Sequence, residues 1–185
     1  MQLVRPSEAH LTSYAAALAR GGSPDNLRGP AATAEELDRI AADPAGFLAA
    51  LDDRDAKGPP MHLPDGSIAA RLPGFHRWMW DGEFARSIGF CWRPGTTDLP
   101  PYCLGHIGYG VVAWKQRRGY ATRALALMLP VAKQEGLPFV ESTTDVDNVA
   151  SERVILANGA ILAEEFITPP VFESTPGLRY RIHFN

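Results

Sequence analysis

The spacing of apolar residues in the first third of the chain predicts one short strand and two helical stretches. Ser7 is positioned to cap the first helix, and Thr33 with Glu36 forms a capping box before the second. Pro44 should divide the second stretch into two pieces. The predicted elements are a strand at 2–6, a helix at 8–19, a loop at 20–30 and a helical stretch at 34–53.

The middle of the chain carries the pattern of a β-hairpin. Residues 56–75 are rich in Gly and Pro and predict a surface loop. Two runs rich in aromatic and β-branched residues, 75–80 and 84–93, flank the sequence DGE at 81–83. An Asp-Gly pair between such runs is a strong hairpin signal. After a further loop, residues 102–112 predict a strand.

Strand and helix patterns alternate in the last third. A helix with one apolar face starts next to Gly119, and Pro130 inside it should kink the helix or loosen its last turn. Further predicted elements are a strand at 137–144, a helix at 147–158, and strands at 160–167 and 178–184. This order predicts an α/β (α+β) fold on a mixed sheet rather than a doubly wound parallel sheet.

Composition narrows the possible classes of protein. A length of 185 residues fits one domain, and 45% hydrophobic with 21% charged residues is typical of a soluble globular protein. The net charge of −3 argues against broad binding to nucleic acid, and the longest apolar run, 124–132, is too short to span a membrane. We therefore expect one cytoplasmic domain over residues 1–185, a monomer or homodimer, with no nucleic-acid or membrane partner. Cys91 and Cys103 show no metal-ligand spacing and are expected to be reduced and structural.

Positive side chains surround the start of the helix that follows Gly119. They are Lys115, Arg117, Arg118 and Arg123. A helix start is already partially positive, so this arrangement indicates an anionic ligand. Gly119 allows the backbone to approach that ligand, and the amides of Arg118 to Thr122 are free donors. Neither G-x-G-x-x-G nor G-x-x-x-x-G-K-[ST] occurs, which disfavours a Rossmann site or a P-loop.

Residues 116–121 (QRRGYA) fit the pattern Q/R-x-x-G-x-G/A and resemble the acyl-CoA-binding signature of the GNAT superfamily of N-acyltransferases. The resemblance covers 105–162, where Asp147-Asn148-x-x-Ser151 follows at the spacing the family uses. The chain is also similar to a poorly characterised group of predicted bacterial acetyltransferases. The resemblance implies a mostly antiparallel sheet of about six to seven strands with about four helices. It also implies that the fourth and fifth strands splay apart.

The resemblance further implies acetyl-CoA, or coenzyme A, as co-substrate, with no metal. The acetyl group would pass to a primary amine of a small molecule or peptide by direct attack in a ternary complex. Pantetheine would lie between the splayed strands, and an N–H near Val112 would stabilise the oxyanion. The expected cofactor contacts are Val111, Val112, Ala113, Arg117, Arg118, Gly119, Tyr120, Ala121, Thr122, Asn148 and Ser151. For Asn148, a simple helix N-cap is the open alternative.

An amine acceptor is mostly protonated at pH 7 and needs a proton acceptor. His106 is favoured because it lies on the fourth strand, where related sequences often have Glu, although a structural histidine stays an alternative. Glu141 begins the end of the fifth strand that we expect to be exposed, and solubility is its alternative role. Glu83 and Asp145 complete the candidates for this role.

The chain departs from the family at Ile155, where many members have a Tyr that protonates the departing thiolate. Either Ser151, Tyr109 or a water would take over, or the thiolate would leave without a dedicated acid. The expected catalytic residues are His106, Glu141 and Ser151. The departure also motivates an alternative function, a non-catalytic acyl-CoA-binding or sensor module. The acceptor pocket has its own candidates, which core packing would equally explain: Trp78, Trp80 and Phe172.

Overall fold

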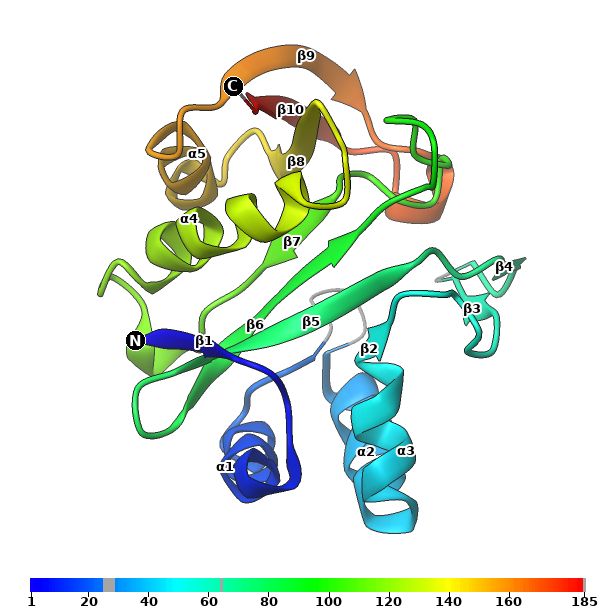
Figure 1. Ribbon diagram of the computed structural model, residues 1–185, viewed down its shortest axis with the longest axis vertical. Helices are drawn as coiled ribbons and strands as arrows, with labels where there is room; N and C mark the ends of the chain where they lie inside the picture. Colours follow the sequence, from blue (N-terminus) through cyan, green and yellow to red (C-terminus); the bar gives the residue numbers. More distant parts are fainter. Residues whose placement is uncertain (25–28, 64, 185) are drawn as a thin grey trace.

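The computed structural model describes residues 1–24, 29–63 and 65–184 (Figure 1). Part of the loop predicted at 20–30 therefore lies outside the described residues. The α-helices are α1 (Glu8–Ala19), α2 (Gly29–Ala42), α3 (Pro44–Ala50), α4 (Tyr120–Lys133) and α5 (Val149–Leu156). The strands are β1 (Gln2–Val4), β2 (Asp52–Asp53), β3 (Met61–His62), β4 (Ile68–Ala69), β5 (Gly74–Trp80), β6 (Phe84–Cys91), β7 (Ile107–Tyr109), β8 (Phe139–Asp145), β9 (Ile161–Ile167) and β10 (Pro176–His183).

Two antiparallel sheets form the centre of the molecule. The first has the strand order β1-β5-β6-β7, with β2 paired to β5, and the second has the order β8-β10-β9. β7 and β8 are neighbours, yet they belong to different sheets and form no ladder (Figure 1). This arrangement confirms the predicted α+β fold and the splay between the fourth and fifth strands of the family.

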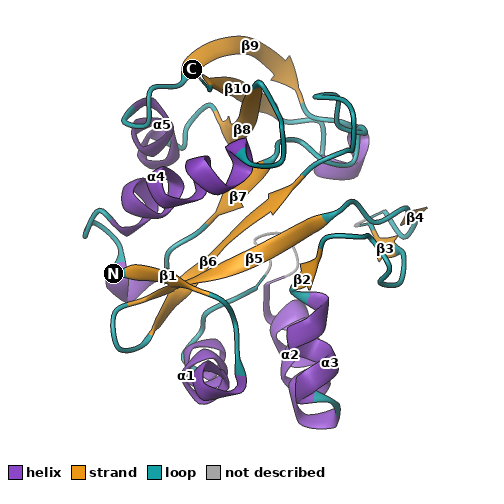
Figure 2. Ribbon diagram, in the orientation of Figure 1, coloured by secondary structure: helices purple, strands orange, loops and turns teal. Residues whose placement is uncertain are grey.

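Helices cover both faces of the first sheet (Figure 2). α4 packs on β6 and β1, and α5 packs on β8 and α4. α1 packs against β6 from the opposite face, with α2 and α3 beside it. The covering helices therefore leave the edges of β7 and β8 as the place where the two sheets separate.

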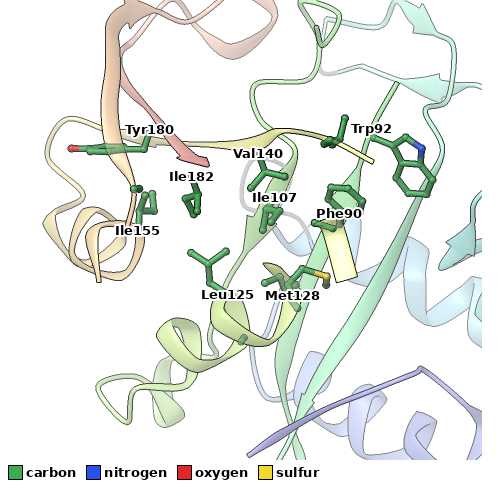
Figure 3. Close-up of a cluster of buried hydrophobic side chains, with 14 of the residues drawn as sticks. Phe90, Trp92, Ile107, Leu125, Met128, Val140, Ile155, Tyr180 and Ile182 are labelled. Carbon is green, nitrogen blue, oxygen red and sulfur yellow. The ribbon is translucent and has the colours of Figure 1, made fainter. Parts of the chain in front are cut away.

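One apolar core joins the two sheets below this separation (Figure 3). Leu125 and Met128 of α4 and Ile155 of α5 are fully buried. They pack with residues from both sheets: Phe90, Ile107, Val140, Tyr180 and Ile182. Burying each large apolar side chain stabilises the fold by about 1.5–3 kcal/mol, so this core holds the sheets together without strand pairing.

The boundaries of some predicted elements differ in the structure. α2 begins at Gly29 because Pro30 suits a first helical turn, so Thr33 lies inside the helix and donates to Gly22 O at 3.2 Å rather than capping it. Ser7 holds the N-cap position of α1, but its hydroxyl pairs with His10 Nδ1 at 2.8 Å. β7 is much shorter than the predicted strand at 102–112 because only β6 pairs with it.

Other predictions agree with the structure. The hairpin turn falls at 81–83 between β5 and β6, with Gly82 at φ +108°. α4 continues through Pro130, and its end tightens to bonds between residues three apart, such as Gln134 N to Val131 O. The prediction of a loop at 56–75, by contrast, is wrong in part, because this segment holds the small β3–β4 hairpin and the first residues of β5.

Candidate active site

Backbone groups along β7 point alternately toward β6 and away from it. Gly110 donates its N–H to Ser87 O at 3.3 Å, and Val112 donates to Ala85 O at 3.0 Å. Even-numbered residues therefore face β6. The N–H of Val112 itself is used inside the sheet, so the oxyanion donor that we expected near Val112 would be a neighbouring amide.

Odd-numbered residues of the same segment turn their backbone groups toward β8. Ile107 O accepts a hydrogen bond of 3.0 Å from Ser142 Oγ of β8. Tyr109 lies opposite Ile88 between two residues that bond β6, so its N–H faces away from β6. In the described residues, the N–H of Val111 has no recorded backbone acceptor. The opening between the sheets is thus lined by N–H groups of Tyr109 and Val111, and the expected cofactor contact of Val111 stays a prediction.

Two cavities adjoin this opening. One of about 250 Å³ lies between β7 and β8 and reaches α5, where Asn148 and Ser151 line it. The other, of about 450 Å³, lies over β5, β6 and β7. Gly108 and Tyr109 line both cavities. Two bound molecules, one in each cavity, would therefore meet at this point of β7.

The basic segment before α4 divides into anchored and exposed parts. Lys115 is 5% exposed and pairs with Asp81 Oδ1 at 2.5 Å and with Glu83 Oε2 at 3.4 Å. Asp81 Oδ2 also accepts from the Tyr120 hydroxyl at 2.6 Å. Lys115 therefore does not offer its charge to a ligand as expected, and Glu83 is an ion-pair partner at the surface. Arg117 and Arg118 are exposed.

Hydrogen bonding sets the charge of Asp81. Burial alone would raise the pKa of this carboxyl group, but the bonds from Lys115 and Tyr120 outweigh burial and lower the pKa to about 2. Asp81 is ionised at neutral pH and clamps the segment onto the β5–β6 turn.

The exposed part of this segment is shaped to receive an anion. Arg117 has φ +58° and Gly119 has φ +71°, so the chain turns sharply before α4. A Cβ at Gly119 would meet no atom within 4 Å, which leaves open space in front of the loop. In the described part of the chain, the amides from Arg117 to Thr122 donate to no recorded acceptor. Such a turn with bare amides at a helix start is suited to phosphate oxygens.

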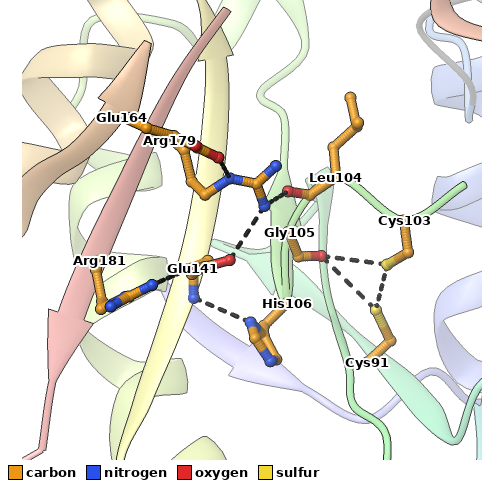
Figure 4. Close-up of polar contacts among 9 residues, drawn as sticks. All are labelled: Cys91, Cys103, Leu104, Gly105, His106, Glu141, Glu164, Arg179 and Arg181. Atoms are coloured by element: carbon orange, nitrogen blue, oxygen red, sulfur yellow. Dashed lines mark hydrogen bonds and ion pairs between the residues drawn. The ribbon is translucent and has the colours of Figure 1, made fainter. Parts of the chain in front are cut away.

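His106 lies at the root of the opening, where β7 and β8 first touch (Figure 4). Its backbone N–H donates to the backbone carbonyl of Glu141 at 2.8 Å, and its ring Nδ1 accepts from the backbone N–H of Glu141 at 3.0 Å. A neutral imidazole that accepts at Nδ1 carries its hydrogen on Nε2. Neutral His106 therefore has its ring hydrogen on Nε2. That buried Nε2 has no recorded partner in the described residues. Burial lowers the pKa of His106 below its ordinary value; Glu141 opposes this, whereas Arg179 and Arg181 add to it.

His106 is therefore a hydrogen-bond donor with its acceptor nitrogen occupied. The role of proton acceptor, which we expected for it, would require the bond from Glu141 N to break. A buried polar atom without a partner needs an explanation, and a ligand in the cavity that His106 lines would supply one.

Glu141 is 8% exposed, so the expectation that it sits at an exposed strand end is wrong. Its carboxylate accepts from Arg179 Nη1 at 3.1 Å and Arg181 Nη2 at 2.7 Å (Figure 4). Arg179 also donates to Leu104 O at 3.0 Å and to Glu164 Oε1 at 2.7 Å. Both carboxylate oxygens are engaged by guanidinium groups, so Glu141 ties β8, β10 and the segment before β7 together.

His76 is the feature that sequence reasoning missed. It lies on β5 opposite Gly89, and Gly89 lies opposite Gly108. A Cβ at Gly89 would be 2.9 Å from Cδ2 and Nε2 of His76, so the imidazole covers Gly89. The only signal in the sequence was the period-two placement of a histidine and glycines on adjacent predicted strands.

Comparison with known proteins identifies the family. A family model described as an acetyltransferase (GNAT) domain matches residues 30–161. The chain belongs to the GNAT acetyltransferases. It is therefore an acetyltransferase of a family whose co-substrate is acetyl-CoA, as the motifs predicted. A comparison with curated proteins gives no match.

Solved GNAT structures share the fold at low sequence identity. An acetyltransferase from Salmonella typhimurium that modifies the N-terminal serine of a 50S ribosomal subunit protein has a TM-score of 0.63 and 15% identity, over 99% of this chain and 94% of that one. The microcin C7 self-immunity acetyltransferase in complex with acetyl-CoA and AMP has 0.62 and 13%, over 98% and 91%. The ribosomal alpha-N-protein acetyltransferase RimL with coenzyme A has 0.62 and 14%, over 98% and 93%.

The second GNAT motif lies at the start of α5. Asn148 caps this helix, because its side chain accepts from Ser151 N at 3.1 Å. Ser151 Oγ lies 3.1 Å from the Tyr109 hydroxyl, which also donates to Ser151 O at 3.2 Å. Ile155, where many members have Tyr, is fully buried in the main core. The hydroxyl-bearing residues Tyr109 and Ser151 therefore lie together at the 250 Å³ cavity.

The aromatic candidates for the acceptor pocket do not line either cavity. Trp78 is 1% exposed and packs with Tyr14 and Phe84, and Trp80 packs against the same cluster. Phe172 belongs to a short 3-10 turn after β9. Core packing accounts for Trp78. In the described ranges, no helix is long and apolar enough to cross a membrane.

Proposed function

We propose that this GNAT domain transfers the acetyl group of acetyl-CoA to a primary amine of a small molecule or peptide, by direct attack in a ternary complex. The observation that carries the proposal is that the two cavities share Gly108 and Tyr109. The 250 Å³ cavity would hold the pantetheine arm, and the 450 Å³ cavity would hold the acceptor. The reacting carbonyl and amine would then meet beside β7.

Coenzyme A would enter through the loop before α4. Its diphosphate would take the amides around Gly119, with Arg117 and Arg118 supplying charge. Pantetheine would pair with the N–H groups of Tyr109 and Val111 in the manner of an added strand, whereas Val111 O already accepts from Gln116 Nε2 at 3.2 Å. Thr144 Oγ1 supports this path, because it is buried, lines the 250 Å³ cavity and has no recorded partner in the described residues.

Two donors would stabilise the oxyanion of a tetrahedral intermediate. The N–H of Tyr109 faces away from β6, and His106 lines the acceptor cavity with a buried Nε2–H that has no recorded partner in the described residues. Donors fixed in advance cost no reorganisation when charge develops, and each is worth about 100- to 1,000-fold in rate. His106 would therefore act through its donated hydrogen bond.

Tyr109 would protonate the departing thiolate. Its hydroxyl lies next to Ser151, and Ile155, at the family's Tyr position, is buried in the core. Burial raises the pKa of Tyr109, and the bond with Ser151 only partly opposes this, so the hydroxyl keeps its proton at neutral pH. Ser151 would orient the hydroxyl, which fits the participation that the sequence suggested for it.

The acceptor class is taken from the family and its solved members. One of these acts on the N-terminal serine of a protein, and another was solved with AMP. Both an amino-terminal peptide and a small molecule are of suitable size for a cavity of about 450 Å³.

The experiment compares two glycine variants of α4. Gly119→Glu puts bulk and negative charge in front of the loop, whereas Gly136→Glu makes the same change at the other end of the helix. Both glycines have positive φ and open space around them, so the backbone strain is matched. We expect calorimetry to show loss of coenzyme A binding for Gly119→Glu alone. Undiminished affinity would contradict the loop assignment.

A sensor module that binds acyl-CoA without turnover is the second candidate, because Ile155 leaves no acid at the family's position. Thiol release from acetyl-CoA, measured with polyamines, amino acids, aminoglycosides and peptides, separates the two functions. Tight binding of coenzyme A with no release on any acceptor would favour the sensor.

A further inference from the structure

His76 is the histidine whose ring is accessible from the acceptor cavity. It lies on β5, its side chain is exposed to the cavity, and it lines the same wall as Gly89 and Gly108. Resting on the function proposed above, we infer that His76 is the catalytic base that takes the proton from the attacking amine.

The sheet leaves a clear path from this imidazole to the opening. His76, Gly89 and Gly108 are direct cross-strand neighbours on β5, β6 and β7. The ring already extends over Gly89, and a Cβ at Gly108 would meet no atom within 4 Å. Neighbouring strands are about 4.8 Å apart, so the ring is about one strand spacing from the point where the two cavities meet. Glycine at both intervening positions is what keeps this path open.

The state of the ring suits a base. In the described part of the chain, neither ring nitrogen of His76 has a recorded hydrogen-bond partner. Desolvation lowers the pKa of His76, and the positive charges of Arg71 and Arg77 lower it further. The imidazole is therefore neutral at pH 7 and has a free lone pair.

The other groups that face this cavity are less suited. They are Asp53, Arg71, Arg86, Cys91, Tyr102, Cys103, His106 and Tyr109. Asp53 accepts from the amides of Lys57 and Gly58 at 2.9 Å, with Arg71 at 3.7 Å. His106 has its acceptor nitrogen occupied. Asp145, named earlier as a candidate, lines the other cavity.

The acetyl transfer needs no reagent other than acetyl-CoA and the amine. The amine lone pair forms the C–N bond as the carbonyl π electrons move to oxygen, where Tyr109 N–H and His106 Nε2–H would bind. The proton on the new ammonium passes to a ring nitrogen of His76. Collapse breaks the C–S bond, and the thiolate takes the hydroxyl proton of Tyr109.

The test uses His76→Gln, which keeps size and polarity but cannot accept a proton near neutral pH. With an amine that the wild type acetylates, we expect kcat to fall by about 100- to 10,000-fold. The Kd for coenzyme A should not change. The acid limb of kcat/KM should lose the part that comes from the enzyme and keep only the part that comes from titration of the amine itself. His183→Gln, on the exposed end of β10, is the matched control.

A second variant separates catalysis from structure. His76→Ala should be equally slow, and free imidazole added to it should restore part of the rate, because it supplies the missing base. A wild type that binds coenzyme A but acetylates no amine would overturn the proposed function and this role with it. A variant with wild-type rate and an unchanged acid limb would overturn the role of His76 alone.

Discussion

His106 shows how a single hydrogen bond decides what an imidazole can do. Its Nδ1 lone pair is committed to Glu141 N, so the ring sits neutral and buried across the root of the opening. The sequence placed it on the correct strand and face but not in the correct role, because the partner comes from β8, which is 35 residues away. The local sequence pattern cannot predict a hydrogen-bond partner that comes from a strand of another sheet.

The buried neutral state of His106 predicts a dependence of stability on pH. The pKa in the folded protein is lowered, so the unfolded chain binds the proton more readily. Stability from this group is fully present above the ordinary pKa of about 6.5 and falls as the pH drops below it. His106→Asn should flatten this decline, because its amide oxygen can still accept from Glu141 N. Urea unfolding from pH 8 to 5 measures it, and the same slope in both proteins would contradict the assignment.

Cys91 and Cys103 form a thiol pair that sequence spacing did not reveal. Their Sγ atoms are 3.3 Å apart, and both approach Gly105 O beside His106 (Figure 4). The hydrogen bond from Cys91 lowers the pKa of Cys103, and Arg179 adds to this. Cys103 is therefore the sulfur expected to react first.

Oxidised glutathione should convert this pair to a disulfide. The Cys103 thiolate would attack the reagent and release one glutathione, and Cys91 would then displace the second. Intact-mass analysis should show loss of two hydrogens in the wild type. Cys91→Ser should stop at a stable glutathione adduct, and a wild type that also stops there would show that the sulfurs cannot approach.

The β5–β6 hairpin and the loop before α4 act as one unit. The hairpin supplies Asp81, and the loop and α4 supply Lys115 and Tyr120, which both bond to it. The sequence predicted the hairpin turn and the loop separately and predicted neither contact. Lys115 was expected to face the ligand, and the structure instead uses it to hold the loop in place.

Asp81→Asn should therefore weaken coenzyme A binding without touching the ligand. Loss of the charge loosens the loop, and a cost of about 1.4 kcal/mol would appear as a tenfold rise in Kd. Asp55→Asn, which removes the 2.7 Å pair with exposed Lys57, is the matched control and should bind normally. Calorimetry at neutral pH measures both, and equal affinities would show that the clamp is not needed.

The same clamp should matter for acid stability. The folded pKa of Asp81 is about 2, below its ordinary value of 3.8. Its contribution is present above that ordinary value and is lost as the pH falls toward about 2. The wild type should therefore lose stability over this range more steeply than Asp81→Asn does.

Features that depend on residues near in the sequence were predicted correctly more often than features that depend on distant residues. The helices, the hairpin and the loop at Gly119 depend on near neighbours and were mostly placed correctly. The exceptions are the start of α2 and the end of the predicted helical stretch at 34–53, where Asp52–Asp53 form β2 instead. Family resemblance supplied the splay that periodicity cannot supply. The path along His76 and Gly89 depends on strand register, and the burial of Glu141 depends on guanidinium groups from β10, so neither could be read from sequence.

The molecule as a whole is two sheets joined by a core and a few contacts at one end of an opening. His106 with Glu141 and Ser142 with Ile107 link the sheets at that end. Beyond them, one edge of β7 has no partner strand in the described residues. The amide hydrogens of an unpaired strand edge exchange with water quickly unless a ligand covers that edge. The architecture thus makes a distinct prediction for alternate amides of a single strand.

Hydrogen exchange should distinguish the amides that face β6 from those that face the opening, along β7 and the residues that follow it. Without ligand, the amides of Tyr109 and Val111 should exchange quickly, whereas Gly110 and Val112, which bond to β6, should be protected. Coenzyme A should slow Tyr109 and Val111 and leave the other two nearly unchanged, because only the odd-numbered donors face the opening. Residue-resolved exchange by NMR, with and without coenzyme A, measures the alternation. Uniform protection of all four amides in the free protein would mean that β8 pairs with β7 in solution, and pantetheine would then have no place to bind.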